Sequence, residues 1–107
     1  MTKRRAWYGI ASLFLLAAST SSFAQTSADT YKAKCQMCHA ADGGADTPAG
    51  KALKARALSS PEVLKESDTD LLAIIKNGKN KMPAFNGKLT DAQIKDVLDY
   101  VHTLQKK

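Results

Sequence analysis

The clearest hydrophobic pattern in the chain lies near its C-terminal end. Apolar residues recur there at helical spacing, namely Ile94, Val97, Leu98, Val101 and Leu104. Thr90, followed three residues later by Gln93, forms a capping box in front of this run. We therefore predict an amphipathic helix that begins after Thr90 and buries one face.

A first helix is predicted directly before the two cysteines of the chain. Thr26 or Ser27 can cap it, and we expect it to run to about Cys38. Glycines and prolines interrupt residues 40–60, so we predict a long loop there. Ser60-Pro61 should begin a short second helix, because proline suits the first helical position.

A third helix is predicted between Ser67, its cap, and Gly78, its stop. Its buried stripe consists of Leu71, Ile74 and Ile75, flanked by Leu72. Residues 77–89 then form a second loop. Strand-like alternation is not found anywhere in the sequence, and the fold class predicted from these patterns is all-α.

Residues 1–24 have the pattern of a secretory signal peptide. Basic residues near the start precede an apolar run over 6–18, and Ser22 and Ala24 are small residues before a cleavage point. We expect cleavage after Ala24, export to the periplasm and one mature domain over residues 25–107. An uncleaved membrane anchor is the alternative, although the run is shorter than the ~20 residues of a spanning helix.

Charge and composition change the functional picture only a little. The whole chain has a net charge of +6, but cleavage would leave 13 basic against 10 acidic residues. Few aromatic residues remain in the mature part, so composition does not indicate a nucleic-acid-binding protein. A domain this small needs a staple, such as a covalently held cofactor, to be stable.

The stretch Cys35-Gln36-Met37-Cys38-His39 carries the main chemical signal. Two cysteines separated by two residues and followed by histidine are the attachment motif for c-type haem. Cys35 and Cys38 can form thioether bonds with the porphyrin, and His39 can then bind the iron as its proximal axial ligand. The sequence therefore predicts one covalent haem c with its iron.

Other uses of the two cysteines fit less well. A zinc site would need further ligands, but the chain has no third cysteine and His102 is its only other histidine. A redox disulfide of the thioredoxin kind would be expected among alternating strands and helices, which the pattern lacks.

Met82 is the predicted second axial ligand of the iron. Of the two methionines in the mature chain, Met37 lies inside the attachment motif and cannot reach across the ring. Met82 lies in the second loop, next to Pro83, which favours an extended backbone. Two alternatives stay open here: Met82 as ordinary core filler, and His102 as the ligand in its place.

These motifs together resemble a known family, the small bacterial class I c-type cytochromes. The resemblance rests on the haem motif, on Lys81-Met82-Pro83-Ala84-Phe85 and on Leu89-Thr90-Asp91-Ala92-Gln93-Ile94, and it covers nearly all of residues 27–104. It implies about four helices around a single haem, with the first and last helices crossing near Tyr31 and Tyr100. It also implies haem contacts for Pro48 and Phe85, with the carbonyl of Pro48 accepting a hydrogen bond from the proximal histidine.

The expected function is one-electron transport, since two axial ligands leave the iron no position for a substrate. The protein would not be an enzyme. We expect a monomer that meets a terminal oxidase, a cytochrome bc-type complex, a dehydrogenase or a photosynthetic reaction centre. Rival hypotheses are a haem sensor or peroxidase-like protein with a labile ligand, and a docked subunit of a larger oxidoreductase.

Lysines flank both loops that should face the haem. They are Lys32, Lys34, Lys51, Lys54, Lys76, Lys79, Lys81 and Lys88. An ordinary solvated surface explains them equally well. As a functional feature, they would form a basic ring that steers acidic partners to the haem edge.

Overall fold

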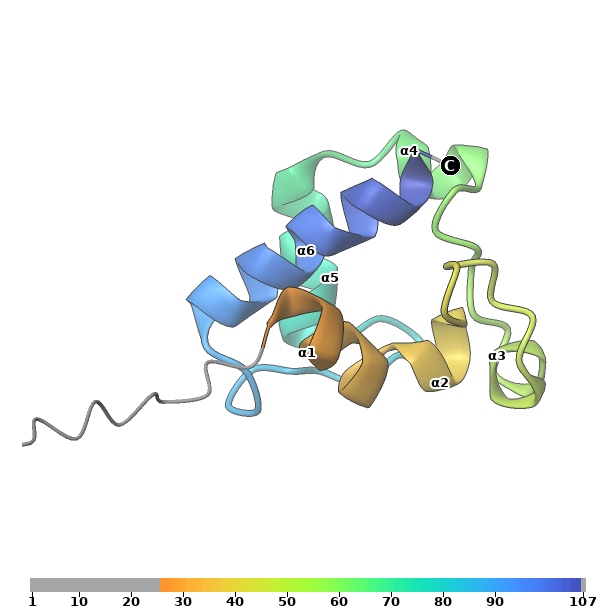
Figure 1. The fold of residues 1–107 in the computed structure, drawn as a ribbon, viewed down its shortest axis with the longest axis horizontal. Coiled ribbons are helices and arrows are strands. Elements are labelled where there is room, and N and C mark those ends of the chain that lie inside the picture. Colours follow the sequence, from red (N-terminus) through yellow and green to blue (C-terminus); the bar gives the residue numbers. More distant parts are fainter. Residues whose placement is uncertain (1–25, 107) are drawn as a thin grey trace, which may run out of the picture.

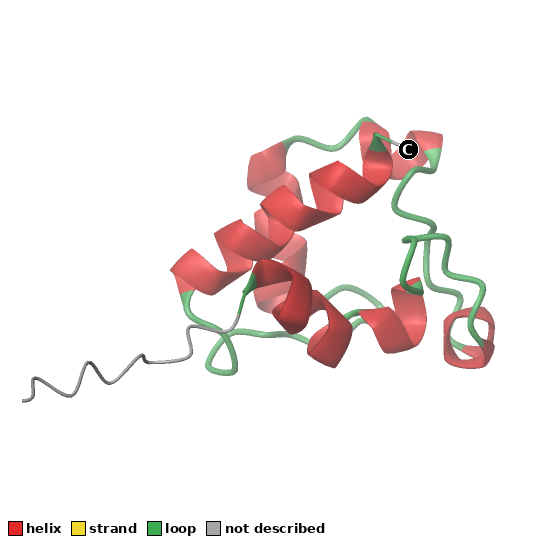
Figure 2. Ribbon diagram, in the orientation of Figure 1, coloured by secondary structure: helices red, strands yellow, loops and turns green. Residues whose placement is uncertain are grey.

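The structure is a computed structural model that describes residues 26–106 (Figure 1). The predicted signal peptide and its cleavage point lie outside the described residues. Six helical segments follow in order: α1 (Ser27–Lys34), α2 (Gln36–His39), α3 (Pro48–Ala52), α4 (Pro61–Leu64), α5 (Asp68–Asn77) and α6 (Asp91–Gln105). The described residues contain helices, loops and two isolated bridge pairs, but no β-strand (Figure 2). The all-α prediction is confirmed.

Hydroxyl side chains begin five of these helices. Thr26, Thr47, Ser60, Ser67 and Thr90 each accept a hydrogen bond from a backbone N–H of the first turn. The capping box of α6 is complete, because Gln93 also accepts from the backbone N–H of Thr90. The caps at Ser67 and Thr90 were predicted from the sequence, and Thr26 was one of two candidates for the first helix. At Ser60 only the helix start was predicted, and the cap at Thr47 was not.

The helix count differs from the expected four for two reasons. The predicted first helix is broken at Cys35, whose carbonyl accepts from the backbone N–H groups of both Cys38 and His39. This break makes α2 a separate turn that carries the attachment motif. The second reason is α3, a short helix inside the predicted loop 40–60, which Thr47 caps and Pro48 begins.

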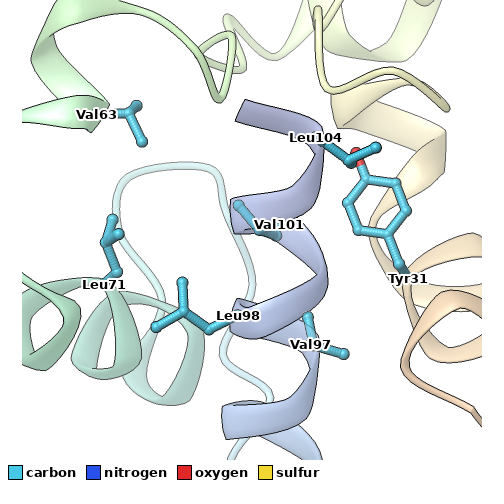
Figure 3. Packing of buried hydrophobic residues seen from close by; sticks show 7 residues of the cluster. All are labelled: Tyr31, Val63, Leu71, Val97, Leu98, Val101 and Leu104. Atoms are coloured by element: carbon cyan, nitrogen blue, oxygen red, sulfur yellow. The ribbon is translucent and has the colours of Figure 1, made fainter. Parts of the chain in front are cut away.

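The core forms where α6 crosses α1 and packs against α5. All five apolar residues of the predicted stripe on α6 are buried. Figure 3 shows side chains from α1, α4 and α5 converging on α6. The ring centroids of Tyr31 and Tyr100 lie 5.2 Å apart at the crossing of α1 and α6, which confirms the predicted contact.

The stripe of α5 is less buried than expected. Leu71 is buried, but Ile74 and Ile75 are only half-buried. Both isoleucines line the large cavity described below, so their exposed surface faces a binding site rather than open solvent. Within residues 26–106, no helix has the length and hydrophobicity needed to cross a membrane.

Candidate functional site

A cavity of about 490 Å³ lies between the attachment turn α2 and the loop that follows α5. Its volume falls in the range of ~300–1,000 Å³ typical of cofactor sites. Cys35, Cys38 and His39 line it together with Met82, although Met82 is far away in the sequence. Most of the remaining lining is apolar, including Leu58, Val63, Leu71, Ile74, Ile75, Phe85, Val97, Leu98 and Val101.

The two cysteines are free thiols rather than a disulfide, and both are half-buried. Burial, followed by the neighbouring Cys38, raises the pKa of the Cys35 thiol to about 11. The two thiols lie on one turn and line the same cavity, as attachment to a single porphyrin requires.

His39 is oriented by a backbone carbonyl. Its Nδ1 atom lies 3.1 Å from the carbonyl oxygen of Arg56, which accepts a hydrogen bond when Nδ1 carries the proton. That tautomer leaves Nε2 with a free lone pair for a metal. Burial lowers the pKa of His39, which favours the neutral imidazole that coordination needs.

The role expected for Pro48 is wrong. The carbonyl that bonds His39 belongs to Arg56, eight residues farther along the chain. Pro48 instead occupies the first position of α3, and it is absent from the residues that line the cavity. The expectation failed because the long loop contains a helix, which shifts the segment that passes beside His39.

The α3 segment braces the attachment turn from outside. The hydroxyl of Thr47 donates to the carbonyl of Met37 at 2.6 Å and accepts from the N–H of Gly50 at 2.9 Å. Gly50 is buried, and the carbonyl oxygen of Cys38 occupies the space that a Cβ atom at this position would need. Any larger residue there would push the turn out of place.

Met82 is half-buried, and a tight backbone pair holds it in the second loop. The N–H of Met82 donates to the carbonyl of Lys79 at 2.9 Å, and the N–H of Lys79 donates to the carbonyl of Met82 at 3.1 Å. Three residues later the N–H of Phe85 donates to the carbonyl of Ile75 at 3.0 Å. The loop is therefore tied to the last turn of α5.

Phe85 lines the cavity and is buried. Together with Leu89 and Ile94, it forms a second core cluster, against which Met82 packs. Because Ile94 belongs to α6, this cluster fastens the second loop to α6 and holds Met82 and Phe85 at the cavity.

His102 is not among the residues that line the cavity. Its Nε2 lies 2.8 Å from a carboxylate oxygen of Asp68, and its Nδ1 lies 2.7 Å from the side-chain oxygen of Gln105. Both ring nitrogens thus have partners on the protein surface. His102 therefore lies away from the cavity, which Met82 lines.

The lining fits a covalently bound haem. Its apolar walls suit a porphyrin, and the paired thiols suit thioether bonds. The imidazole of His39 and the thioether of Met82 are of the types that would supply a His/Met pair to a haem iron. Of the eight lysines that flank the loops, Lys34, Lys54, Lys79 and Lys81 line the cavity and are exposed.

Sequence reasoning missed several residues of the site. Arg56 and Thr47 act through hydrogen bonds to the attachment turn, and Gly50 acts through its lack of a side chain. The hydroxyl of Tyr31 donates to the buried carbonyl of Ala40 at 2.6 Å, just after the motif. The one available signal was the pair Thr47-Pro48, a cap followed by a helix-starting proline.

The helices around an apolar cavity, with one attachment motif, define the class of protein: a small class I c-type cytochrome with a single covalently bound haem. Comparison with known proteins agrees. Residues 23–101 match the family model described as "Cytochrome C oxidase, cbb3-type, subunit III". A solved structure, the "KustC0563 c-type cytochrome", aligns with a TM-score of 0.68 at 29% identity and covers 75% of this chain and 98% of its own.

Two sequence relatives are both called cytochrome c6. The protein of a Synechococcus species is 41% identical over 86 residues, covering 78% of this chain and 74% of its own length. The protein of Gracilaria tenuistipitata is 42% identical over 71 residues, which is 66% of this chain and 63% of that protein. This chain therefore belongs to the cytochrome c family, as an electron-transfer protein whose cofactor is a covalent haem c.

Proposed function

We propose that this protein is a periplasmic carrier of single electrons, with Cys35 and Cys38 bonded to the haem and with His39 and Met82 as axial ligands. The observation that carries the proposal is that these four side chains line one apolar cavity. When bound, the haem supplies a reversible one-electron couple, and His/Met ligation favours a high potential.

The residues of the chain have separate tasks in this function. The carbonyl of Arg56 orients the imidazole of His39, and the backbone pair of Lys79 with Met82 holds the thioether. The apolar lining keeps water from the centre, which reduces reorganisation when an electron arrives or leaves. Two protein ligands leave no position for a substrate, so electron exchange rather than catalysis is the function of the site.

Recognition of partners belongs to the exposed edge of the cavity. The exposed lysines Lys34, Lys54, Lys79 and Lys81 make this edge basic. Met37, of which 75% is exposed, and Leu53 lie among the same lining residues and supply apolar contact area. This combination suits brief encounters with redox proteins that carry acidic docking surfaces.

The experiment is a comparison of second-order electron transfer rates with an acidic redox acceptor. Reversing Lys54 and Lys81 to Glu should slow transfer most at low salt, because the Debye length falls from ~30 Å at 0.01 M to ~8 Å at 0.15 M. Reversing Lys95 and Lys106, exposed lysines that do not line the cavity, is the control with the same charge change. Equal losses of rate in both variants would show that only the net charge matters and not the position of the lysines. A wild-type protein that exchanges no electrons would contradict the carrier function.

A further inference from the structure

One carboxylate contacts both the segment around Arg56, whose carbonyl bonds His39, and the loop that carries Met82. Glu66 stands in the short connection between α4 and α5, and 21% of its side chain is exposed. Its Oε1 atom lies 3.2 Å from the guanidinium of Arg56 and 4.0 Å from the ammonium of Lys79. Among the described residues, its Oε2 atom is buried with no hydrogen-bond partner.

Each of these two cations is one backbone contact away from an axial ligand. Arg56 presents its carbonyl to Nδ1 of His39. Lys79 forms the backbone pair that holds Met82. Arg56 and Lys79 are also among the residues that line the cavity, and Glu66 is not.

We propose that Glu66 is a positioning residue that clamps the His39 segment to the Met82 loop and holds the reduction potential of the centre down. The inference rests on the proposed ligation by His39 and Met82. It goes further in assigning control of the Arg56 segment beside His39 and of the Met82 loop to a residue that touches neither ligand.

The physical argument begins with the charges. Without the carboxylate, Arg56 and Lys79 are like charges facing one cavity, and their repulsion would push the two loops apart. A partly buried carboxylate with one oxygen lacking a partner depends strongly on its cations, because desolvation of the charge has to be offset. Glu66 therefore holds the side chains of Arg56 and Lys79 close together, and these two cations in turn hold the carboxylate in place.

The sign of the effect on potential follows from the same charges. The oxidised centre carries one positive charge more than the reduced centre. A negative group nearby stabilises the oxidised state, and its removal disfavours that state. Neutralising Glu66 should therefore raise the reduction potential.

The test compares two carboxylate variants of the haem-loaded protein, Glu66→Gln and Glu62→Gln. Both remove one negative charge, but Glu62 is exposed on α4 and has no part in the contacts that hold the ligand loops. Two quantities are measured: the midpoint potential, and the rate at which added imidazole enters the ferric iron, which reports opening of the Met82 loop.

For Glu66→Gln we expect a rise of about 3- to 10-fold in the reduced-to-oxidised ratio at fixed potential, or ~30–60 mV at 59 mV per tenfold. We also expect imidazole entry to be about fivefold faster. Glu62→Gln should leave the entry rate at the wild-type value. If Glu66→Gln leaves imidazole entry unchanged, the clamp is refuted, whatever the potential does.

Lys79→Met removes the contact between Lys79 and Glu66 by changing the residue on the Met82 loop. It serves as the test if Glu66→Gln yields no folded protein. It should speed imidazole entry, whereas Lys95→Met, a matched charge loss on α6, should not. In the double variant Glu66→Gln/Lys79→Met, imidazole entry should be accelerated by less than the product of the two single accelerations, because both changes break the same contact. An acceleration equal to that product would mean that the two residues act independently and would overturn the proposal. A wild-type protein without methionine ligation would instead contradict the proposed function, so the two failures are distinguishable.

Discussion

The carbonyl oxygen of Met82 lies 2.7 Å from the position that a Cβ atom on Gly78 would occupy. Gly78 also has a φ of +77°, a left-handed conformation that residues with side chains adopt only with strain. The residue that ends α5 is thus also the one over which the ligand loop folds back. Both the end of α5 and the position of Met82 therefore require that residue 78 has no side chain.

Gly78→Ala should therefore displace the Met82 loop. We expect a loss of about 1–3 kcal/mol in unfolding free energy and a smaller methionine–iron band in the far red. Gly87→Ala is a matched control, because Gly87 has a φ of +83° but nothing within 4 Å of its Cβ position. The control should show only the strain cost, of about 1 kcal/mol, with an unchanged band. Equal effects on the band would remove the role assigned to the Gly78–Met82 contact.

Tyr31→Phe tests the hydrogen bond that ends the attachment turn. Burial, the largest cause, raises the pKa of Tyr31, so its hydroxyl stays protonated and donates to the carbonyl of Ala40. Removing the donor leaves the buried carbonyl of Ala40 with the backbone N–H of Gly43, 3.2 Å away, as its remaining donor, and we expect a loss of about 1 kcal/mol in denaturant unfolding. Tyr100→Phe, which leaves the bond to Ala40 intact, should cost less; an equal cost would assign the effect to the ring pair.

His102 should make stability depend on pH. Its hydrogen bond with Gln105, followed by its contacts with Asp68 and Asp99, raises the pKa of His102 against the opposing effect of partial burial. A raised pKa in the folded state means that the stabilisation is fully present below the ordinary pKa of ~6.5 and is lost as pH rises through the folded value.

The measurement is the difference in unfolding free energy between wild type and Asp68→Asn from pH ~5.5 to ~9. The difference should be under ~1 kcal/mol, because the pair is largely exposed, and it should shrink as pH rises. Asp70→Asn, which also replaces an acidic residue in the first turn of α5, is the control. A difference that grows with pH would contradict the assignment.

The sequence predicted the parts of the fold that local chemistry determines. Thr90 with Gln93, Ser67 and Gly78 mark helix ends through short-range hydrogen bonds and backbone conformation, and these predictions are confirmed. The stripe of α6 was readable because its residues share a single buried face. The break at Cys35 was not readable, since a helix that ends at Lys34 and begins again at Gln36 leaves no trace in the periodicity.

The site was predictable as far as its motif extends. Cys35, Cys38, His39 and Met82 line one cavity, and their roles as haem attachment residues and iron ligands stay a prediction. Arg56 could not be found, because its contact with His39 is made by a backbone carbonyl, which every residue carries. The same limit explains the mistaken choice of Pro48: the path of a loop decides which carbonyl reaches the imidazole.

Replacing Cys35 or Cys38 with Ala should lower the yield of folded protein. Several apolar residues of the cavity lining, among them Leu53, Ile74 and Ile75, are exposed or half-buried, and they pack fully only when the cofactor is fixed there. Protein yield after export and helicity by circular dichroism measure this effect. Full yield and helicity in the haem-free double variant would show that the helices pack without the cofactor.

The central claim is that one haem is held by His39 and Met82. It is tested most directly by the oxidised spectrum of the wild-type protein beside that of Met82→Ala. We predict a weak far-red methionine–iron band in the wild type, and in the variant loss of the band, retained covalent haem, a lower potential and rapid binding of carbon monoxide by the ferrous iron. A far-red band that persists unchanged in Met82→Ala would contradict the account.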